Sequence, residues 1–65
     1  MKVFEVITET SVDDSNEIIE EVQYVTSDQD TLKSVTDYFT QHCYEYEKEL
    51  RSVREVLVIV QHIES

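Results

Sequence analysis

Residues Lys2–Thr26, KVFEVITETSVDDSNEIIEEVQYVT, read as two β-strands around a turn, and this hairpin decides the fold. Lys2–Thr10 is rich in β-branched residues and alternates in polarity, as half-buried strands do. Residues 13–16, DDSN, are turn formers, and Glu17–Thr26 is again apolar and β-branched. The pattern therefore predicts an antiparallel hairpin.

The uncharged positions of the first strand predict which of its faces is buried. Its even-numbered positions, from Phe4 to Val12, carry no charge, whereas the odd-numbered positions include Glu5 and Glu9. Because successive side chains of a strand point to opposite faces, the even-numbered positions form the better core face.

The length of the hairpin loop fixes which residues of the second strand join this core face. A loop of three or five residues would place Ile18, Val22 and Tyr24 there. A loop of four residues would instead place Glu21 and Gln23 there. Since burial of an apolar face fixes the register of a strand, we expect three or five loop residues.

A helix is predicted from about residue 28 to residues 47–50. Ser27 is the expected N-cap, and Asp30 three residues later gives a near capping box. The apolar positions of the segment recur at helical spacing, so this side should pack on the sheet. They are Leu32, Val35, Phe39, Cys43 and Tyr46.

The third strand is predicted at Arg54–Ile63, REVLVIVQHI, the most hydrophobic run of the chain. Both of its faces are apolar, which is typical of a strand that is covered on two sides. One face is expected to hold Val56, Val58 and Val60, and the other Val53, Leu57, Ile59 and Ile63.

Together these elements predict one α+β domain over residues 1–65 with the order ββαβ. The simplest arrangement is a three-stranded antiparallel sheet of order 2-1-3, with the first strand in the centre and the helix on one face. The other face is then open and partly apolar, which favours a homodimer. We expect self-association through Val3, Ile7, Val25, Leu57 and Ile59; Ile19, Glu5, Glu9 and Glu21 are also expected on this face.

The charge is uneven along the chain. The net charge is -10, and residues 1–30 hold nine acidic residues and one basic residue. Such a field favours a partner protein with a basic surface. The candidate contact residues are the acidic side chains of the predicted hairpin: Glu5, Glu9, Asp13, Asp14, Glu17, Glu20 and Glu21.

Several other activities are disfavoured by the residues present. Asp14 and Asn16 alternate like ligands of a calcium loop, but Ile18 takes the next ligand position and the chain has no glycine, so no metal or cofactor is expected. Cys43 and His42 are adjacent on a predicted helix and do not face each other, so catalysis is not expected. Five basic residues against fifteen acidic ones disfavour direct nucleic-acid binding.

The chain is expected to be cytoplasmic. Its single cysteine allows no intrachain disulfide and is typical of a reducing compartment. The start, MKVFEVITET, has too short an apolar run for a signal peptide. No stretch approaches the roughly 20 apolar residues of a membrane helix, so no membrane association is expected.

The size, the acidity and the ββαβ order, with VFEVITET, EEVQYVT and SVREVLVIV as strands, resemble small proteins encoded by bacteriophages. Several such families inhibit host defences, among them anti-restriction and anti-CRISPR proteins, and some are acidic mimics of nucleic acid. The resemblance implies a non-enzymatic inhibitor that occupies a basic site of a host defence or nucleic-acid-handling protein in the host cytoplasm.

Two other functions remain open from the sequence. The first is a homodimeric structural or assembly protein whose acidic residues only keep it in solution. The second is a small-molecule-binding protein with a site between protomers, near Tyr24, Tyr44 or Tyr46.

Overall fold

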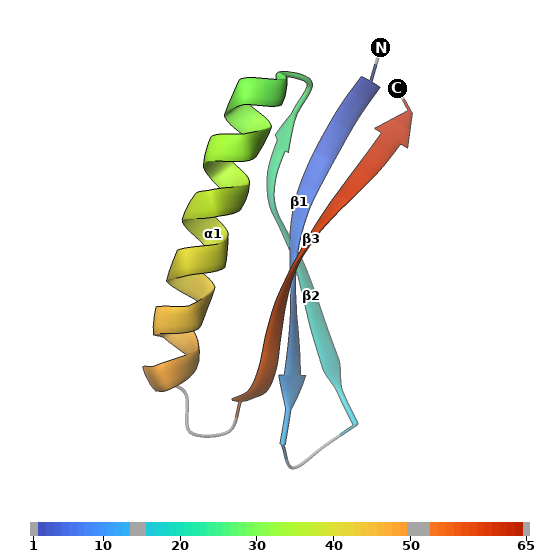
Figure 1. Ribbon diagram of the computed structural model, residues 1–65. Helices are drawn as coiled ribbons and strands as arrows, with labels where there is room; N and C mark the ends of the chain where they lie inside the picture. The colour runs from blue at the N-terminus through green and yellow to red at the C-terminus, as the bar shows by residue number, and fades with distance from the viewer. Residues whose placement is uncertain (1, 14–15, 50–52, 65) are drawn as a thin grey trace.

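The computed structural model describes residues 2–13, 16–49 and 53–64, which form three strands and one helix (Figure 1). The elements are β1 (Lys2–Val12), β2 (Ile18–Thr26), α1 (Gln29–Glu49) and β3 (Val53–Glu64). The strand order is β2-β1-β3, and β1 is antiparallel to both neighbours. The predicted α+β, ββαβ arrangement is confirmed.

The sheet is long and strongly twisted, and α1 runs along one side of it (Figure 1). β1 and β3 pair from Lys2 opposite Glu64 to Val12 opposite Val53, so the central strand is paired over its whole length. The molecule measures 40 × 21 × 10 Å along its principal axes. A body this thin has room for one helical layer, which leaves one face of the sheet uncovered.

Two of the three buried residues of β1, Val6 and Thr8, lie on the side that was predicted to face the core, and Ile7 lies on the other side. Val6 is fully buried, and Thr8 is 7% exposed. Directly opposite them on β3 lie Val60 and Val58, and Val56 follows on the same face. This face of the sheet, here called the covered face, packs against α1, mainly over β3. The half-buried apolar positions described in the helix recur at helical spacing: Leu32, Val35, Phe39 and Cys43.

The predicted register of the first half of β2 is wrong. Five residues, 13–17, separate the strands, but the Val12 N–H donates to the Glu17 carbonyl over 3.5 Å, and Ser11 lies opposite Ile18. This register is that of a four-residue loop. It places Ile18 and Val22 on the uncovered face.

The physical reason is a β-bulge at Gln23, where the pairing shifts between Val6 and Ile7. The extra residue returns Tyr24 to the covered face, opposite Val6, as predicted. Gln23 donates from Nε2 to Thr8 Oγ1 over 2.9 Å, so the bulge also supplies a partner for a buried hydroxyl.

Other residues also lie on a different face from the one predicted. Glu20, expected on the same side of the strand as Ile18 and Val22, lies opposite Glu9 on the uncovered face. Ile19 and Glu21 lie opposite Thr10 and Thr8, on the covered face. A register shift between Ser11 and Val12 leaves Arg54 as an extra residue and places Val53 opposite Val12, also on the covered face. Each change follows from one inserted residue, because a slip of one position reverses the face.

The N-cap of α1 is Asp28 and not Ser27. The Thr31 N–H and hydroxyl donate to Asp28 Oδ2 over 2.9 and 2.6 Å, and the Leu32 N–H donates to the Asp28 carbonyl over 2.9 Å. The Asp28 N–H donates to Thr26 Oγ1 over 3.0 Å, which delays the start of the helix by one residue. The hydrogen bonds from Thr31 lower the pKa of Asp28 below its ordinary value.

The helix ends at Glu49, within the predicted range. No helix in residues 2–13, 16–49 and 53–64 combines the length and the hydropathy that crossing a membrane requires.

Candidate protein-binding face

The face of the sheet away from α1 is here called the open face. It carries the odd-numbered residues of β1 and the residues opposite them on β2 and β3. Its members are Val3, Glu5, Ile7, Glu9 and Ser11 of β1, Ile18, Glu20, Val22 and Val25 of β2, and Glu55, Leu57, Ile59, Gln61 and Ile63 of β3.

The centre of the open face is apolar. Ile7 lies between Val22 on β2 and Ile59 on β3, and these neighbours leave only 4% of it exposed. The flanking side chains have no covering layer, and Val25 and Leu57 are 51% and 45% exposed. Burying this apolar area against another surface would contribute roughly 25 cal/mol per Å².

Carboxylates lie on both sides of the apolar centre along the strands. Glu5 and Glu9 lie on either side of Ile7 along β1, about 14 Å apart at a rise of about 3.4 Å per residue. Glu20 lies directly opposite Glu9, and Glu55 lies opposite Ser11. One carboxylate therefore lies on one side of the row formed by Val22, Ile7 and Ile59, and three lie on the other side. They do not form a closely spaced track like a phosphate backbone.

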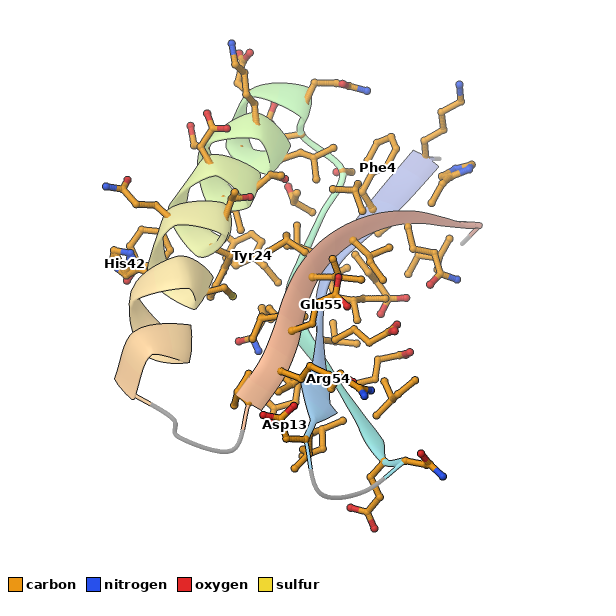
Figure 2. All side chains as sticks on the ribbon, turned by 60° about the horizontal axis from the view of Figure 1, so that its bottom comes forward. Phe4, Asp13, Tyr24, His42, Arg54 and Glu55 are labelled. Carbon is orange, nitrogen blue, oxygen red and sulfur yellow. The ribbon has the colours of Figure 1, made fainter. Side chains whose placement is uncertain are left out.

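A basic side chain lies at the end of the sheet that carries Glu55. Arg54 donates from a guanidinium nitrogen to Ser11 Oγ over 2.8 Å. In Figure 2, Tyr24 lies between α1 and the sheet, whereas Arg54 and Glu55 lie on the far side of β3 from the helix. The open face therefore carries charges of both signs along β3. Its charged residues on β1 and β2 are all acidic.

The predicted contact residues are divided by the fold. Glu5, Glu9 and Glu20 lie on the open face, whereas Glu21 lies on the covered face, where Gln23 Nε2 donates to its Oε2 over 3.1 Å. The rest belong to the hairpin end: Asp13 and Glu17 are exposed there, and Asp14 lies outside the described residues. The predicted acidic surface is thus three separate groups.

The open face also contains residues that the sequence analysis missed. Glu55 is an odd-numbered residue of β3, as Leu57 and Ile59 are. The alternation of the third strand could therefore have placed it on the same face as these two residues. Ile18 and Val22 were assigned to the wrong face because the bulge at Gln23 has no clear sequence signal.

The five residues predicted for self-association do share one face. Val3, Ile7, Val25, Leu57 and Ile59 all belong to the open face. Ile7 is buried by its neighbours in the same sheet, so it is unavailable to a second molecule. The other four are at least partly accessible, and their role in self-association stays a prediction.

His62 lies on β3, with its ring centroid 5.4 Å from that of Phe4, and further chemistry-bearing side chains lie on α1. The Tyr38 and His42 rings stack with centroids 3.9 Å apart, and both residues are exposed. Cys43 is half-buried, and burial raises the pKa of its thiol above the ordinary value. The side chains of Tyr44 and Tyr46, named above for a small-molecule site, lie outside the described residues.

The described side chains include no group of three or more His, Cys, Asp or Glu placed to hold a metal ion. The feature that the fold builds is thus a surface, with an apolar centre and a charged border, as protein interfaces have. Comparisons of the chain with protein-family models, with curated proteins and with solved structures give no match.

Proposed function

We propose that this protein is a small non-enzymatic binding protein that occupies a basic site of another protein with its open face. The observation that carries the proposal is the apolar centre around Ile7, bordered by Glu5, Glu9, Glu20 and Glu55. An apolar centre within a polar rim is the usual anatomy of a protein interface. The partner should present apolar side chains surrounded by Lys and Arg.

The charge of the face favours a basic partner over a second copy stacked on it. Two open faces in contact would lie about 10 Å apart, the spacing of packed sheets. Eight carboxylates would then face one another, against two copies of Arg54. Like charges that lose their water on contact cost several kcal/mol, so face-to-face self-association is disfavoured.

The resemblance to phage-encoded inhibitors supplies the class of target that we propose. It is a host defence or nucleic-acid-handling protein, because such proteins keep a basic groove for phosphates. The carboxylates of the open face would meet those basic side chains, and the apolar centre would add affinity that nucleic acid does not offer. The protein would then inhibit by occupying the groove.

The proposal is tested by capture from a lysate of the native host, with the immobilised chain as bait. We expect one main captured protein with a basic site. Duplex DNA should displace it, and so should a rise in ionic strength from about 0.15 M to about 1 M, which shortens the Debye length from about 8 Å to about 3 Å.

A matched pair of bait variants locates the contact. The first variant, Glu9→Lys with Glu20→Lys, replaces two negative charges of the open face with two positive ones. The two residues still form a like-charge pair across the strands, so the fold should change little. Glu21→Lys with Asp37→Lys makes the same charge change on exposed residues outside the open face. Loss of capture only with the first variant supports the proposal. Equal capture by both variants, or capture that DNA leaves intact, would refute it.

A further inference from the structure

The outer edge of β3 is one of the two strand edges of the sheet, and α1 packs over one face of this strand. β3 is the last strand of the order β2-β1-β3, so its outer backbone groups meet no strand in the described part of the chain. Its pairing with β1 is unbroken from Glu55 to Glu64, without a bulge. The segment Val56–Val60 contains no charge and no proline. Such an edge is a template for pairing with another strand.

The other edge of the sheet is protected in the ways that natural proteins use. β2 has the bulge at Gln23, which interrupts its regular pairing, and two adjacent charges, Glu20 and Glu21. Bulges and edge charges both discourage the addition of a strand. β3 also has an extra residue, Arg54, next to the charged Glu55, but both lie near its start and outside Val56–Val60. This difference favours β3 as the edge that pairs with another chain.

We propose that β3 pairs antiparallel with β3 of a second copy, which joins the two sheets into one sheet of six strands. The proposed register places Val58 opposite Val58 of the second copy, Leu57 opposite Ile59, and Val56 opposite Val60. Every residue of Val56–Val60 then meets an apolar residue, and Glu55 meets Gln61. The segment is self-complementary, as a twofold interface requires.

The partial exposure of the β3 side chains gives this pairing its driving force. Leu57, Ile59 and Val60 are 45%, 37% and 43% exposed. Side chains directly opposite in an antiparallel pair have Cβ atoms about 4.5–5.5 Å apart, so each gains a new apolar neighbour. The pairing also supplies hydrogen-bond partners for backbone groups on the outer edge of β3.

The charge distribution permits edge pairing, although it disfavours stacked faces. Glu5 and Glu9 lie on β1, so their counterparts in the second copy lie three strand spacings away, about 14 Å. Glu20 lies on β2, five spacings from its counterpart, or about 24 Å. Both separations exceed the Debye length of about 8 Å at physiological ionic strength.

A twofold axis perpendicular to the sheet keeps each residue on its own face. Both helices therefore lie on one side of the six-stranded sheet. Because each helix packs mainly over its own β3, the two lie next to each other at the junction, and the pairing requires their axes to be about 8–10 Å apart. The two open faces lie side by side on the other side of the sheet. The dimer leaves the open face accessible, so this inference is independent of the proposed function.

Sedimentation velocity of the purified chain over a hundredfold concentration range tests the proposal. We expect the mass to rise from one to two chains. Leu57→Lys places a charge in the pairing segment and should keep the chain monomeric. Val25→Lys is the matched control, because Val25 is similarly exposed on the open face but lies on β2. The control should dimerise like the native chain.

Two results would overturn edge pairing. One is a monomeric native chain over the whole range, and the other is a dimer that Val25→Lys disrupts as strongly as Leu57→Lys does. The second result would indicate that the faces stack.

Cross-linking tests the register without relying on the Leu57→Lys variant. In a Cys43→Ser background, the variants Leu57→Cys and Ile59→Cys are mixed and oxidised. Because Leu57 is proposed to lie opposite Ile59, the disulfide should join one chain of each variant. Disulfides formed only between identical variants, or none, would contradict the register.

Discussion

Glu9 on β1 lies directly opposite Glu20 on β2, so two like charges form one cross-strand pair on the open face. Like charges in this position oppose folding of the hairpin. The contacts described for the chain give no structural reason for it to carry both carboxylates. Under the proposed function, both carboxylates would face basic side chains of the partner. This relationship yields a direct prediction about stability.

Replacing Glu20 with Lys should stabilise the fold. The Glu9–Glu20 repulsion becomes an attraction, and we expect a gain of about 0.2–1 kcal/mol in the free energy of unfolding, measured by urea denaturation at low salt. The control is Glu21→Lys, which changes the neighbouring residue on the covered face. A variant that is less stable than the native chain would contradict the cross-strand pairing of these residues.

Removal of the Gln23 side chain should destabilise the sheet. Gln23 Nε2 donates to Oγ1 of Thr8, which is 7% exposed, so Gln23→Ala leaves a buried hydroxyl without this partner. We expect a loss of about 1 kcal/mol in the free energy of unfolding. Gln61→Ala, on the exposed surface of β3, should change it much less. Equal effects of the two substitutions would argue against the bulge geometry.

The helix cap predicts how stability depends on pH. The pKa of Asp28 is lowered in the folded chain by the hydrogen bonds from Thr31. A lowered folded pKa contributes stability that is present above the unfolded value, which is ordinarily 3.8, and lost as the pH falls through the folded value. Asp28→Asn keeps a capping side chain that does not titrate.

Thermal melts of the native chain and of Asp28→Asn, taken from pH 7 to pH 2, measure this contribution. The native chain should lose more stability than the variant as the pH falls below 3.8. Parallel curves for the two proteins would show that the Asp28 carboxylate does not cap α1. Asp30→Asn, in the first turn, controls for the general effect of removing a carboxylate.

The elements and their order could be predicted from the sequence because each has a strong periodic signal. Period two in β1 and β3 and the helical spacing of Leu32, Val35 and Phe39 follow directly from backbone geometry. The central position of β1 could also be predicted, because an antiparallel hairpin and one returning helix allow few strand orders in a small sheet.

The register of β2 could not be predicted because it depends on a tertiary contact. No feature of the sequence around Gln23 indicates a bulge. The hydrogen bond from Gln23 to Thr8 forms only when the two strands have paired. The N-cap was misplaced for a related reason. Ser27 and Asp28 are both good capping residues, and the hydroxyl of Thr26 favours the second by accepting the Asp28 N–H.

These two errors had different consequences for the candidate site. The misplaced cap leaves the open face unchanged, whereas the misplaced register put Ile19 and Glu21 there in place of Ile18, Glu20 and Val22. The predicted open face was therefore less apolar than the one that the fold builds. Only the paired strands reveal that carboxylates border an apolar centre.

The central claim is that the open face is the surface that binds a basic partner. Its most direct test is the dissociation constant of the captured partner at 0.15 M NaCl, measured for the native chain, for the variant with Glu9→Lys and Glu20→Lys, and for the variant with Glu21→Lys and Asp37→Lys. We predict at least about tenfold weaker binding for the first variant, which corresponds to about 1.4 kcal/mol, and a much smaller change for the second. Native affinity in the first variant, or equal loss in both, would contradict the claim.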